Sequence, residues 1–208
     1  MKIISHSGAK GLAGANNIKS IALADTFKVD YIEFDVQFTG DNQGVLSHNS
    51  KINGRQIESL HSSQIPPGYD FLAPAMEAIT KATPIIELKQ SGTRQLLHRQ
   101  NIKRSYAVAS FHINNLIPAN NEQAVSETFV LQKYHPIGLL NKCQANNFTG
   151  LGVNKNWLLV VPFIYSKAQK KGKKMFIYTL NSVWLAKIVS KIMPELYICT
   201  DRPDKLLR

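Results

Sequence analysis

Short apolar runs alternate with amphipathic stretches along the whole chain. Nine runs rich in β-branched and aromatic residues are predicted to be strands, at 3–6, 30–36, 45–48, 84–88, 106–111, 128–132, 150–153, 175–180 and 197–200. Between them, the pattern predicts helices over 18–27, 74–81, 93–99, 113–120, 158–169 and 183–192. Alternation of strand and helix is typical of βαβ units built on a parallel sheet. The chain is therefore predicted to have an α/β fold.

The closed architecture that fits this pattern best is a (β/α)₈ TIM barrel, although 208 residues lie near the short limit for that fold. The run 45–48 follows 30–36 after only a turn, which is too short for a parallel crossover. We expect a somewhat irregular barrel that forms a single domain over 1–208, with an open doubly wound sheet as the alternative. Segment 50–71 contains Pro66-Pro67-Gly68 and is expected to be a short inserted loop over the active-site face.

Charge narrows the range of partners. The chain has 25 Lys and Arg against 14 Asp and Glu, a formal net charge of +11, which attracts nucleic acid, anionic lipid or a phosphorylated small molecule. The lysine cluster 167–174 lacks interleaved aromatic residues, so we expect it to end a helix, with Gly172 as the C-cap, rather than to bind nucleic acid. No apolar run reaches the roughly 18 residues of a membrane span, and no secretory segment follows Met1. We expect a soluble cytoplasmic domain.

Acidic residues are scarce, so their placement is informative. Glu33 and Asp35 are two positions apart in an apolar strand run and therefore point to the same face. Two buried carboxylates without a partner are costly, and a hard cation such as Mg²⁺ or Ca²⁺ removes that cost. A surface strand, or a pairing with lysine, remains the alternative. Glu87 and Lys89 repeat the spacing on a second strand, and on one barrel these side chains converge at the C-terminal mouth, where Lys89 can bind phosphate.

Two histidines end predicted strands. His6 closes the first strand and His48 closes the run 45–48, and two imidazoles can divide the roles of general base and general acid near neutral pH. A lone histidine near a core is more often structural, but this pair accompanies three acids at strand ends. His112, after the run 106–111, is held in reserve. The sequence contains no G-x-S-x-G, Walker or G-x-G-x-x-G motif and no zinc-ligand spacing.

Seven ordered segments resemble the motifs of the glycerophosphodiester phosphodiesterases. His6-Ser7-Gly8-Ala9 resembles the family's H-R-G-A, segment 30–37 its Y-I-E-x-D-V-x, and Ser47-His48-Asn49 the end of its V-x-x-H-D. Segments 86–89, 109–111, 177–181 and 199–204 resemble the family's E-x-K, S-S-F, W-T-V-N and I-T-D-R-P-D motifs. The resemblance runs in order over essentially the whole chain.

The resemblance implies a barrel enzyme that cleaves glycerophosphodiesters to glycerol 3-phosphate and an alcohol. It implies one divalent cation, Mg²⁺ or Ca²⁺, held by Glu33, Asp35 and Glu87. It also implies His6 and His48 as the acid–base pair. Lys89 and Tyr178 are the candidate substrate-binding residues.

The sequence departs from the family pattern at several positions, among them Asn49 in place of the aspartate after His48 and Asn17 in place of the threonine of P-E-N-T. The usual arginine is Ser7 and the glutamate of P-E-N-T is Ala15, so one phosphate donor and one acid are missing. Three hypotheses follow. The first is a metal-dependent phosphodiesterase acting on a small glycerophosphodiester or a lipid headgroup, with transient contact with an anionic membrane left open. The second is a catalytically impaired barrel that binds phosphodiesters or anionic lipid headgroups. The third, nucleic-acid binding, rests on net charge alone and is not expected.

Overall fold

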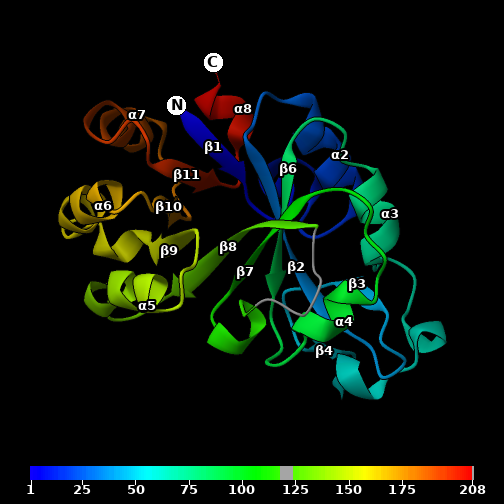
Figure 1. Cartoon of the computed structure of the whole chain (residues 1–208). Coiled ribbons are helices and arrows are strands. Elements are labelled where there is room, and N and C mark those ends of the chain that lie inside the picture. The colour runs from blue at the N-terminus through cyan, green and yellow to red at the C-terminus, as the bar shows by residue number, and fades with distance from the viewer. Residues whose placement is uncertain (118–123, 208) are drawn as a thin grey trace.

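Eight parallel strands close into a barrel in the computed structural model, which describes residues 1–117 and 124–207 (Figure 1). In the described chain the first strand pairs with both the second and the last, so the barrel has no open edge. This closure confirms the TIM barrel and excludes the open doubly wound sheet. The barrel strands are β1 (Lys2–Ser5), β2 (Tyr31–Phe38), β6 (Thr83–Leu88), β7 (Tyr106–Ser110), β8 (Val125–Gln132), β9 (Gly150–Asn154), β10 (Lys174–Tyr178) and β11 (Tyr197–Thr200).

Short helices follow the strands and cover the outside of the barrel. In Figure 1 the later helices α5, α6 and α7 lie along one side, and α2, α3 and α4 along the other. Most helices have ten residues or fewer, which is how a (β/α)₈ topology fits into 208 residues. The helices are α1 (Lys10–Ala13), α2 (Ile18–Thr26), α3 (Leu72–Glu77), α4 (Arg94–His98), α5 (Leu139–Ala145), α6 (Val161–Lys170), α7 (Val183–Ile192) and α8 (Pro203–Leu206).

Two sequence-based predictions for helices are wrong. The sequence predicts none between β8 and β9, but α5 is there, preceded by the turn η4 (Pro136–Gly138). The predicted helix 113–120 begins instead as a single 3₁₀ turn, η3 (Ile113–Asn115), and positions 118–120 lie outside the described residues. The lysine cluster does end a helix, as predicted: α6 ends at Lys170, Lys171 is its C-cap, and Gly172 follows with a φ of 63°.

One of the nine predicted strands, the run 45–48, does not belong to the barrel. The run 45–48 is replaced by β3 (Gly44–Leu46), which pairs antiparallel with the carboxyl end of β2. Segment 50–71 contains a two-stranded hairpin, β4 (Lys51–Ile52) and β5 (Arg55–Gln56), and two 3₁₀ turns, η1 (Ile57–Ser59) and η2 (Ser62–Gln64). The Gly40 N–H donates to the Leu60 carbonyl, so the segment packs beside the carboxyl end of β2.

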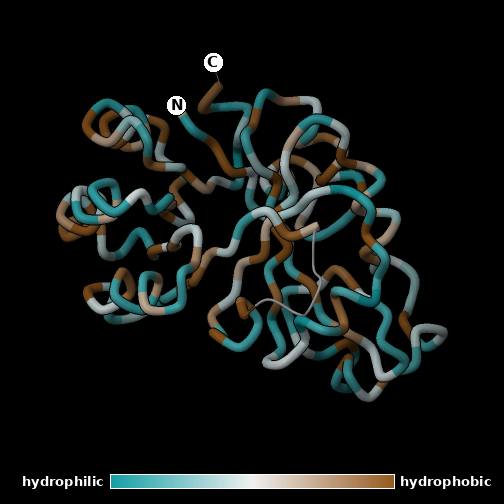
Figure 2. Tube along the Cα trace, viewed as in Figure 1, coloured by the Kyte–Doolittle hydropathy of each residue, from teal (hydrophilic) through white to brown (hydrophobic). Residues whose placement is uncertain are grey.

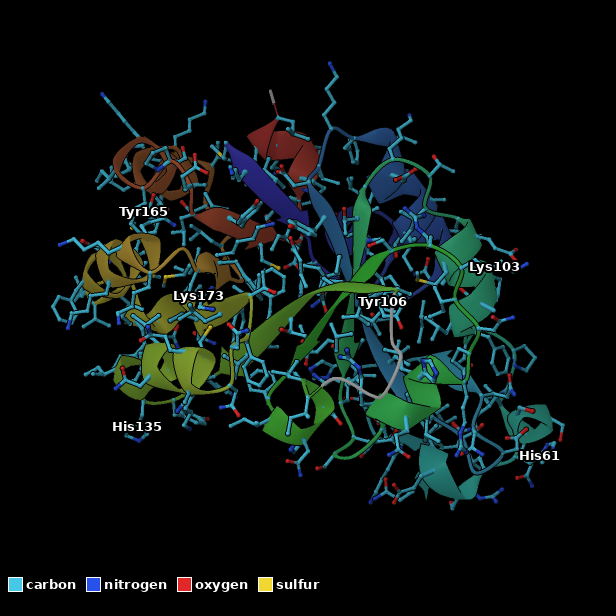
Figure 3. All side chains as sticks on the ribbon, viewed as in Figure 1. His61, Lys103, Tyr106, His135, Tyr165 and Lys173 are labelled. Carbon is cyan, nitrogen blue, oxygen red and sulfur yellow. The ribbon has the colours of Figure 1, made fainter. Side chains whose placement is uncertain are left out.

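Apolar residues form two layers, one between strands and helices and one inside the barrel. Figure 2 shows how apolar positions alternate with polar ones along the chain. The inner layer contains the rings of Tyr31, Phe129, Phe176 and Tyr197. A Cβ on Gly152 would lie 2.5 Å from the Phe176 ring, so the glycine of β9 provides the space that this ring fills. Figure 3 places Tyr106 near the centre of the molecule and Lys103 and His61 at its periphery. The barrel is thus a packed core rather than a channel.

A polar network lies at the amino-terminal end of the barrel strands. The Tyr31 hydroxyl donates to Glu127 Oε2 at 2.7 Å, and the Lys174 ammonium contacts both the Tyr31 oxygen and the Glu127 carboxylate. Burial and the neighbouring Glu127 raise the pKa of Tyr31 well above its ordinary value, so the phenol stays protonated. The charges of Glu127 and Lys174 therefore pair with each other at this end of the barrel.

Candidate active site

Three carboxylates meet at the carboxyl end of the barrel. Glu33 and Asp35 share a face of β2, and the parallel register with β6 sets Glu87 beside Asp35. One oxygen of each carboxylate lies within 4.8 Å of one oxygen of each of the others. The structure thus brings together the three acids that were predicted from the sequence to converge at the mouth of the barrel.

The loop after β1 holds Glu33 in place. The Ser7 N–H donates to Glu33 Oε2 at 2.9 Å, and the Gly8 N–H donates to the Glu33 carbonyl. Gly8 has a φ of 74°, and a Cβ there would lie 2.4 Å from the Ser20 hydroxyl of α2. Only glycine therefore lets this loop pack against α2 while its amides face the glutamate.

Asn16 orients the second carboxylate. Its Nδ2 donates to Asp35 Oδ2 at 2.8 Å, and its Oδ1 accepts from the Asp35 N–H at 2.9 Å. Asn16 is buried, with a φ of 53°, just before the N-cap Asn17 of α2. The sequence analysis assigned no role to Asn16, although it follows Ala15 in the segment that resembles P-E-N-T. Its two bonds fix both the backbone and the side chain of Asp35.

Lys89 lies against the carboxylate cluster. Its ammonium is 2.6 Å from Glu87 Oε1 and 3.3 Å from Asp35 Oδ1. Burial lowers the pKa of this lysine, but the adjacent carboxylates more than offset that effect and leave the pKa above its ordinary value. Lys89 is therefore a permanent positive charge at the base of the site.

One lysine does not compensate three buried acids. Burial, followed by the charge of Asp35, raises the pKa of both Glu33 and Glu87 well above the ordinary range. In the described part of the molecule, Glu33 Oε1 is buried and has no hydrogen-bond partner. Carboxylate oxygens are the ligands that Mg²⁺ and Ca²⁺ prefer, and a divalent cation would both pair this oxygen and relieve the repulsion. The donor set therefore fits a hard divalent cation.

His6 comes directly after β1 and faces the cluster. Its Nε2 is 4.0 Å from Glu33 Oε2, and its Nδ1 is 2.6 Å from Asp201 Oδ1. A carboxylate only accepts, so the hydrogen bond puts the proton on Nδ1 and leaves Nε2 free to accept one. Burial lowers the pKa of His6, but Asp201 and Glu33 more than offset it and raise the pKa above its ordinary value.

Asp201 is a second site residue to which the sequence analysis gave no role. It follows β11, within the segment that resembles I-T-D-R-P-D. Asn181 fixes its orientation by donating from Nδ2 to Asp201 Oδ2 at 2.6 Å and by accepting from the Asp201 N–H. The Lys10 ammonium lies 3.9 Å from Asp201 Oδ1, which adds a second cation at the mouth.

His48 does not belong to the group of side chains whose ligand atoms lie within 4.8 Å of one another. It follows β3, which is not a barrel strand, and its side chain is exposed. The preceding residue, Ser47, donates its N–H to the Asp35 carbonyl, so His48 begins just beyond the cluster. His48 lines a groove of about 590 Å³ together with Phe111, Tyr134, Lys133 and Lys142, among others.

Tyr178 lies between the cluster and this groove. Its ring meets the Phe111 ring edge to face, with centroids 6.3 Å apart, and its buried hydroxyl has no partner among the described residues. Burial and the nearby charge of Glu87 raise the pKa of Tyr178, which keeps the hydroxyl as a donor. The reserve candidate, His112, is exposed and outside the cluster, with its backbone N–H bonded to Ser110.

Comparison with known proteins points to one family. A curated protein of Bacillus subtilis (strain 168), "Putative glycerophosphodiester phosphodiesterase YhdW", is 27% identical to the chain, covering 100% of this chain and 97% of that protein. The chain resembles the glycerophosphodiester phosphodiesterases along its whole length. No family model matches the sequence. The resemblance predicted from the sequence motifs is confirmed by this relative.

Solved structures share the fold. A glycerophosphodiester phosphodiesterase of Parabacteroides distasonis ATCC 8503 has a TM-score of 0.82 at 21% identity, over 99% of this chain and 94% of that one. A phosphodiesterase of Oleispira antarctica, in complex with its product sn-glycerol-3-phosphate, has a TM-score of 0.83 at 19% identity, over 99% and 95%. Among the described residues, no helix combines the length and apolar character needed to cross a bilayer.

Proposed function

We propose that this protein is a phosphoric diester hydrolase that cleaves glycerophosphodiesters to glycerol 3-phosphate and an alcohol, with a divalent cation as cofactor. The observation that carries the proposal is the buried cluster of Glu33, Asp35 and Glu87, with the unpartnered Glu33 Oε1, at the carboxyl end of the barrel. Active sites of this fold form at that end. The name of the Bacillus relative and the product bound to the Oleispira enzyme support the same substrate class.

In this proposal Glu33, Asp35 and Glu87 hold the cation, Mg²⁺ or Ca²⁺. Bound there, the cation would stabilise negative charge on the phosphoryl oxygens. Lys89 and Tyr178 would contact the substrate phosphate as a point charge and a hydrogen-bond donor. The family's arginine is absent at position 7, where Ser7 instead uses its backbone N–H to hold Glu33. Positive charge at the mouth comes from Lys89 and Lys10.

His6 and His48 are assigned to proton transfer. His6 takes a proton at Nε2 from the attacking hydroxyl or water, and Asp201 stabilises the resulting imidazolium through Nδ1. His48 gives a proton to the oxygen of the departing alcohol. The groove that His48 lines then receives that alcohol.

The competing function is a barrel that binds phosphodiesters without turning them over. The comparisons do not favour it, because the relatives are named as phosphodiesterases. A histidine hydrogen-bonded to a fixed aspartate is also of little use to a pure binding protein, whereas it suits a general base.

The test is release of glycerol 3-phosphate from a panel of glycerophosphodiesters, with Mg²⁺, with Ca²⁺ and with a chelator. We expect release that requires a divalent cation. Glu33→Gln should lower kcat/KM by roughly 10²–10³-fold, the scale for losing one source of transition-state charge stabilisation. The exposed Glu77→Gln on α3 is the matched control and should leave the rate unchanged. Absence of metal-dependent hydrolysis for every diester would contradict the proposal.

The acid–base assignment has its own test. His6→Ala and His48→Ala should each lower turnover by roughly 10²–10⁴-fold without loss of fold. The exposed His98→Ala on α4 controls for the loss of an imidazole elsewhere. Wild-type turnover in either of the first two variants would remove that residue from the mechanism.

A further inference from the structure

Large apolar side chains that stay exposed gather on one end of the barrel. In a (β/α)₈ barrel, every segment that follows a strand begins at the carboxyl end, around the mouth. We call five of these eight segments the mouth rim, namely 6–17, 111–117, 133–145, 155–163 and 179–185, which follow β1, β7, β8, β9 and β10; the segments after β2, β6 and β11 are not part of it. Of the twelve exposed large apolar residues in the described chain, eight lie in the mouth rim: Leu12, Phe111, Ile117, Tyr134, Ile137, Leu159, Phe163 and Trp184.

The degree of exposure is high. Leu159, in the turn after η5 (Lys155–Trp157), is 98% exposed, and Ile137 in η4 is 70% exposed. Trp184, in the first turn of α7, is 72% exposed. Single exposed apolar residues are ordinary on a protein surface. A set concentrated at one end marks a surface that meets an apolar partner.

The charge of the mouth rim restricts that partner. The five segments contain Lys10, Lys133, Lys142 and Lys155 and no aspartate or glutamate. The acids near the mouth are either buried, such as Glu33 at 4% exposure, or belong to the segments after β2 and β11, such as Asp41 and Asp201. Asp201 lies 3.9 Å from Lys10, so the remaining rim lysines, Lys133, Lys142 and Lys155, carry most of the charge argument. A surface that combines exposed leucine, phenylalanine and tryptophan with lysines, and that has no acid in its own segments, complements a partner that is both anionic and apolar beneath its charge.

We propose that the mouth rim docks on an anionic phospholipid surface. Trp184 and Tyr134 belong to the residue types that favour the interface between headgroups and acyl chains, and Leu159 and Phe163 supply apolar area. Each lysine near such a surface contributes attraction, and its aliphatic stem lies along the apolar region while the ammonium meets the headgroups. Docking in this orientation turns the barrel mouth and its groove toward the lipid headgroups. The inference does not depend on the proposed hydrolytic activity.

The test is co-sedimentation of the full chain with vesicles of phosphatidylglycerol and phosphatidylcholine, compared with vesicles of phosphatidylcholine alone. We expect binding to the anionic vesicles that weakens as salt rises, and little binding to the neutral ones. Helix α7 offers a matched pair. It begins shortly after the carboxyl end of β10, so Trp184 in its first turn belongs to the mouth rim, whereas Ile192, 65% exposed, is its last residue and lies a helix length away.

Trp184→Glu and Leu159→Glu should each weaken vesicle binding about tenfold, since each removes the burial of one large apolar side chain and adds a repelled charge. Ile192→Glu should stay within about twofold of wild type. If a charged variant folds poorly, Leu159→Ser provides a second variant whose vesicle binding can be measured, because Leu159 is 98% exposed and its loss removes little packing. Absence of binding to anionic vesicles at low salt, or equal weakening by the rim and control variants, would overturn the proposal. The proposal would also be overturned if the wild-type protein formed a dimer that Leu159→Glu dissociates, because the rim would then be an interface between two copies.

Discussion

The hydrogen bond between His6 and Asp201 allows one prediction to be worked out atom by atom. Asp201 Oδ1 accepts from His6 Nδ1, and Asp201 Oδ2 accepts from Asn181 Nδ2, each at 2.6 Å. The amide of Asn181 cannot turn over, because its Oδ1 accepts from the Asp201 N–H and from the Thr200 hydroxyl. In Asp201→Asn the new amide must therefore point its oxygen at Asn181. Its NH₂ group then faces His6.

An NH₂ group facing Nδ1 reverses the tautomer of His6. Nδ1 must accept, so the proton moves to Nε2, which can no longer take a proton from the nucleophile. Loss of a charge-assisted hydrogen bond alone corresponds to about 1.5–3 kcal/mol, or roughly 10- to 150-fold in rate. With the wrong tautomer added, we expect kcat to fall by roughly 10²–10⁴-fold; the upper end is the loss of about 10⁴-fold that follows when the triad aspartate of a serine protease becomes asparagine. The KM should change little, because the variant keeps its volume and the cation site.

The decisive assay is rescue by a second substitution. In Asp201→Asn combined with Asn181→Asp, the new carboxylate at 181 accepts from the amide at 201, so the amide oxygen can face His6 Nδ1 again. We expect the double variant to recover at least about tenfold in kcat over the single variant, measured as glycerol 3-phosphate release. The single change Asn181→Asp, which places two carboxylates together, should not exceed wild type. A double variant no faster than Asp201→Asn, or wild-type rates in Asp201→Asn, would refute the tautomer argument.

Two further predictions concern the support of the site and of the fold. Asn16→Ala removes both bonds that orient Asp35 and should weaken metal-dependent activity about 10- to 100-fold, with a higher metal concentration at half-activation in a Mg²⁺ titration. The Asp25 carboxylate accepts from the N–H groups of Thr80, Lys81 and Ala82 and from the Thr80 hydroxyl. Asp25→Ala should therefore lower the free energy of unfolding, measured by urea denaturation at neutral pH, by about 2–4 kcal/mol. Burial raises the pKa of Asp25, but these donors more than offset it and leave the pKa below its ordinary value. The stabilisation is therefore present above about pH 4 and is lost as pH falls through the folded pKa, so the two proteins should converge in stability in acid.

The barrel strands were predictable because burial on both faces leaves a local trace. Continuous apolar runs such as Pro84-Ile85-Ile86 are typical of strands that are covered on both faces. All eight barrel strands overlap predicted ones. The helix α5 left no such trace. It has seven residues and begins after Pro136 and Gly138, which are typical of turns, so its periodicity is too short to register.

The site was predictable only where spacing along one strand decides geometry. Glu33 and Asp35 share a face by the alternation of a strand, and Glu87 with Lys89 by the same rule. The pairing of His6 with Asp201 joins residues 195 positions apart and exists only because the last strand closes on the first. The exposure of His48 depends on β3 leaving the barrel, which a run of three apolar residues does not reveal.

The position of Lys89 among the acids has a consequence for charge balance. With all groups ionised, the carboxylates of Glu33, Asp35 and Glu87 and the ammonium of Lys89 leave two negative charges, which one divalent cation balances. A loaded centre would then be neutral and would draw the substrate phosphate through local contacts rather than through net attraction. The product monoester carries more negative charge than the diester, so a neutral centre would hold it less firmly than a positive one. The charge of Lys89 therefore affects the rate of product release, because it brings the centre loaded with a divalent cation to neutrality. A trivalent ion in the same site would leave one surplus positive charge and slow release.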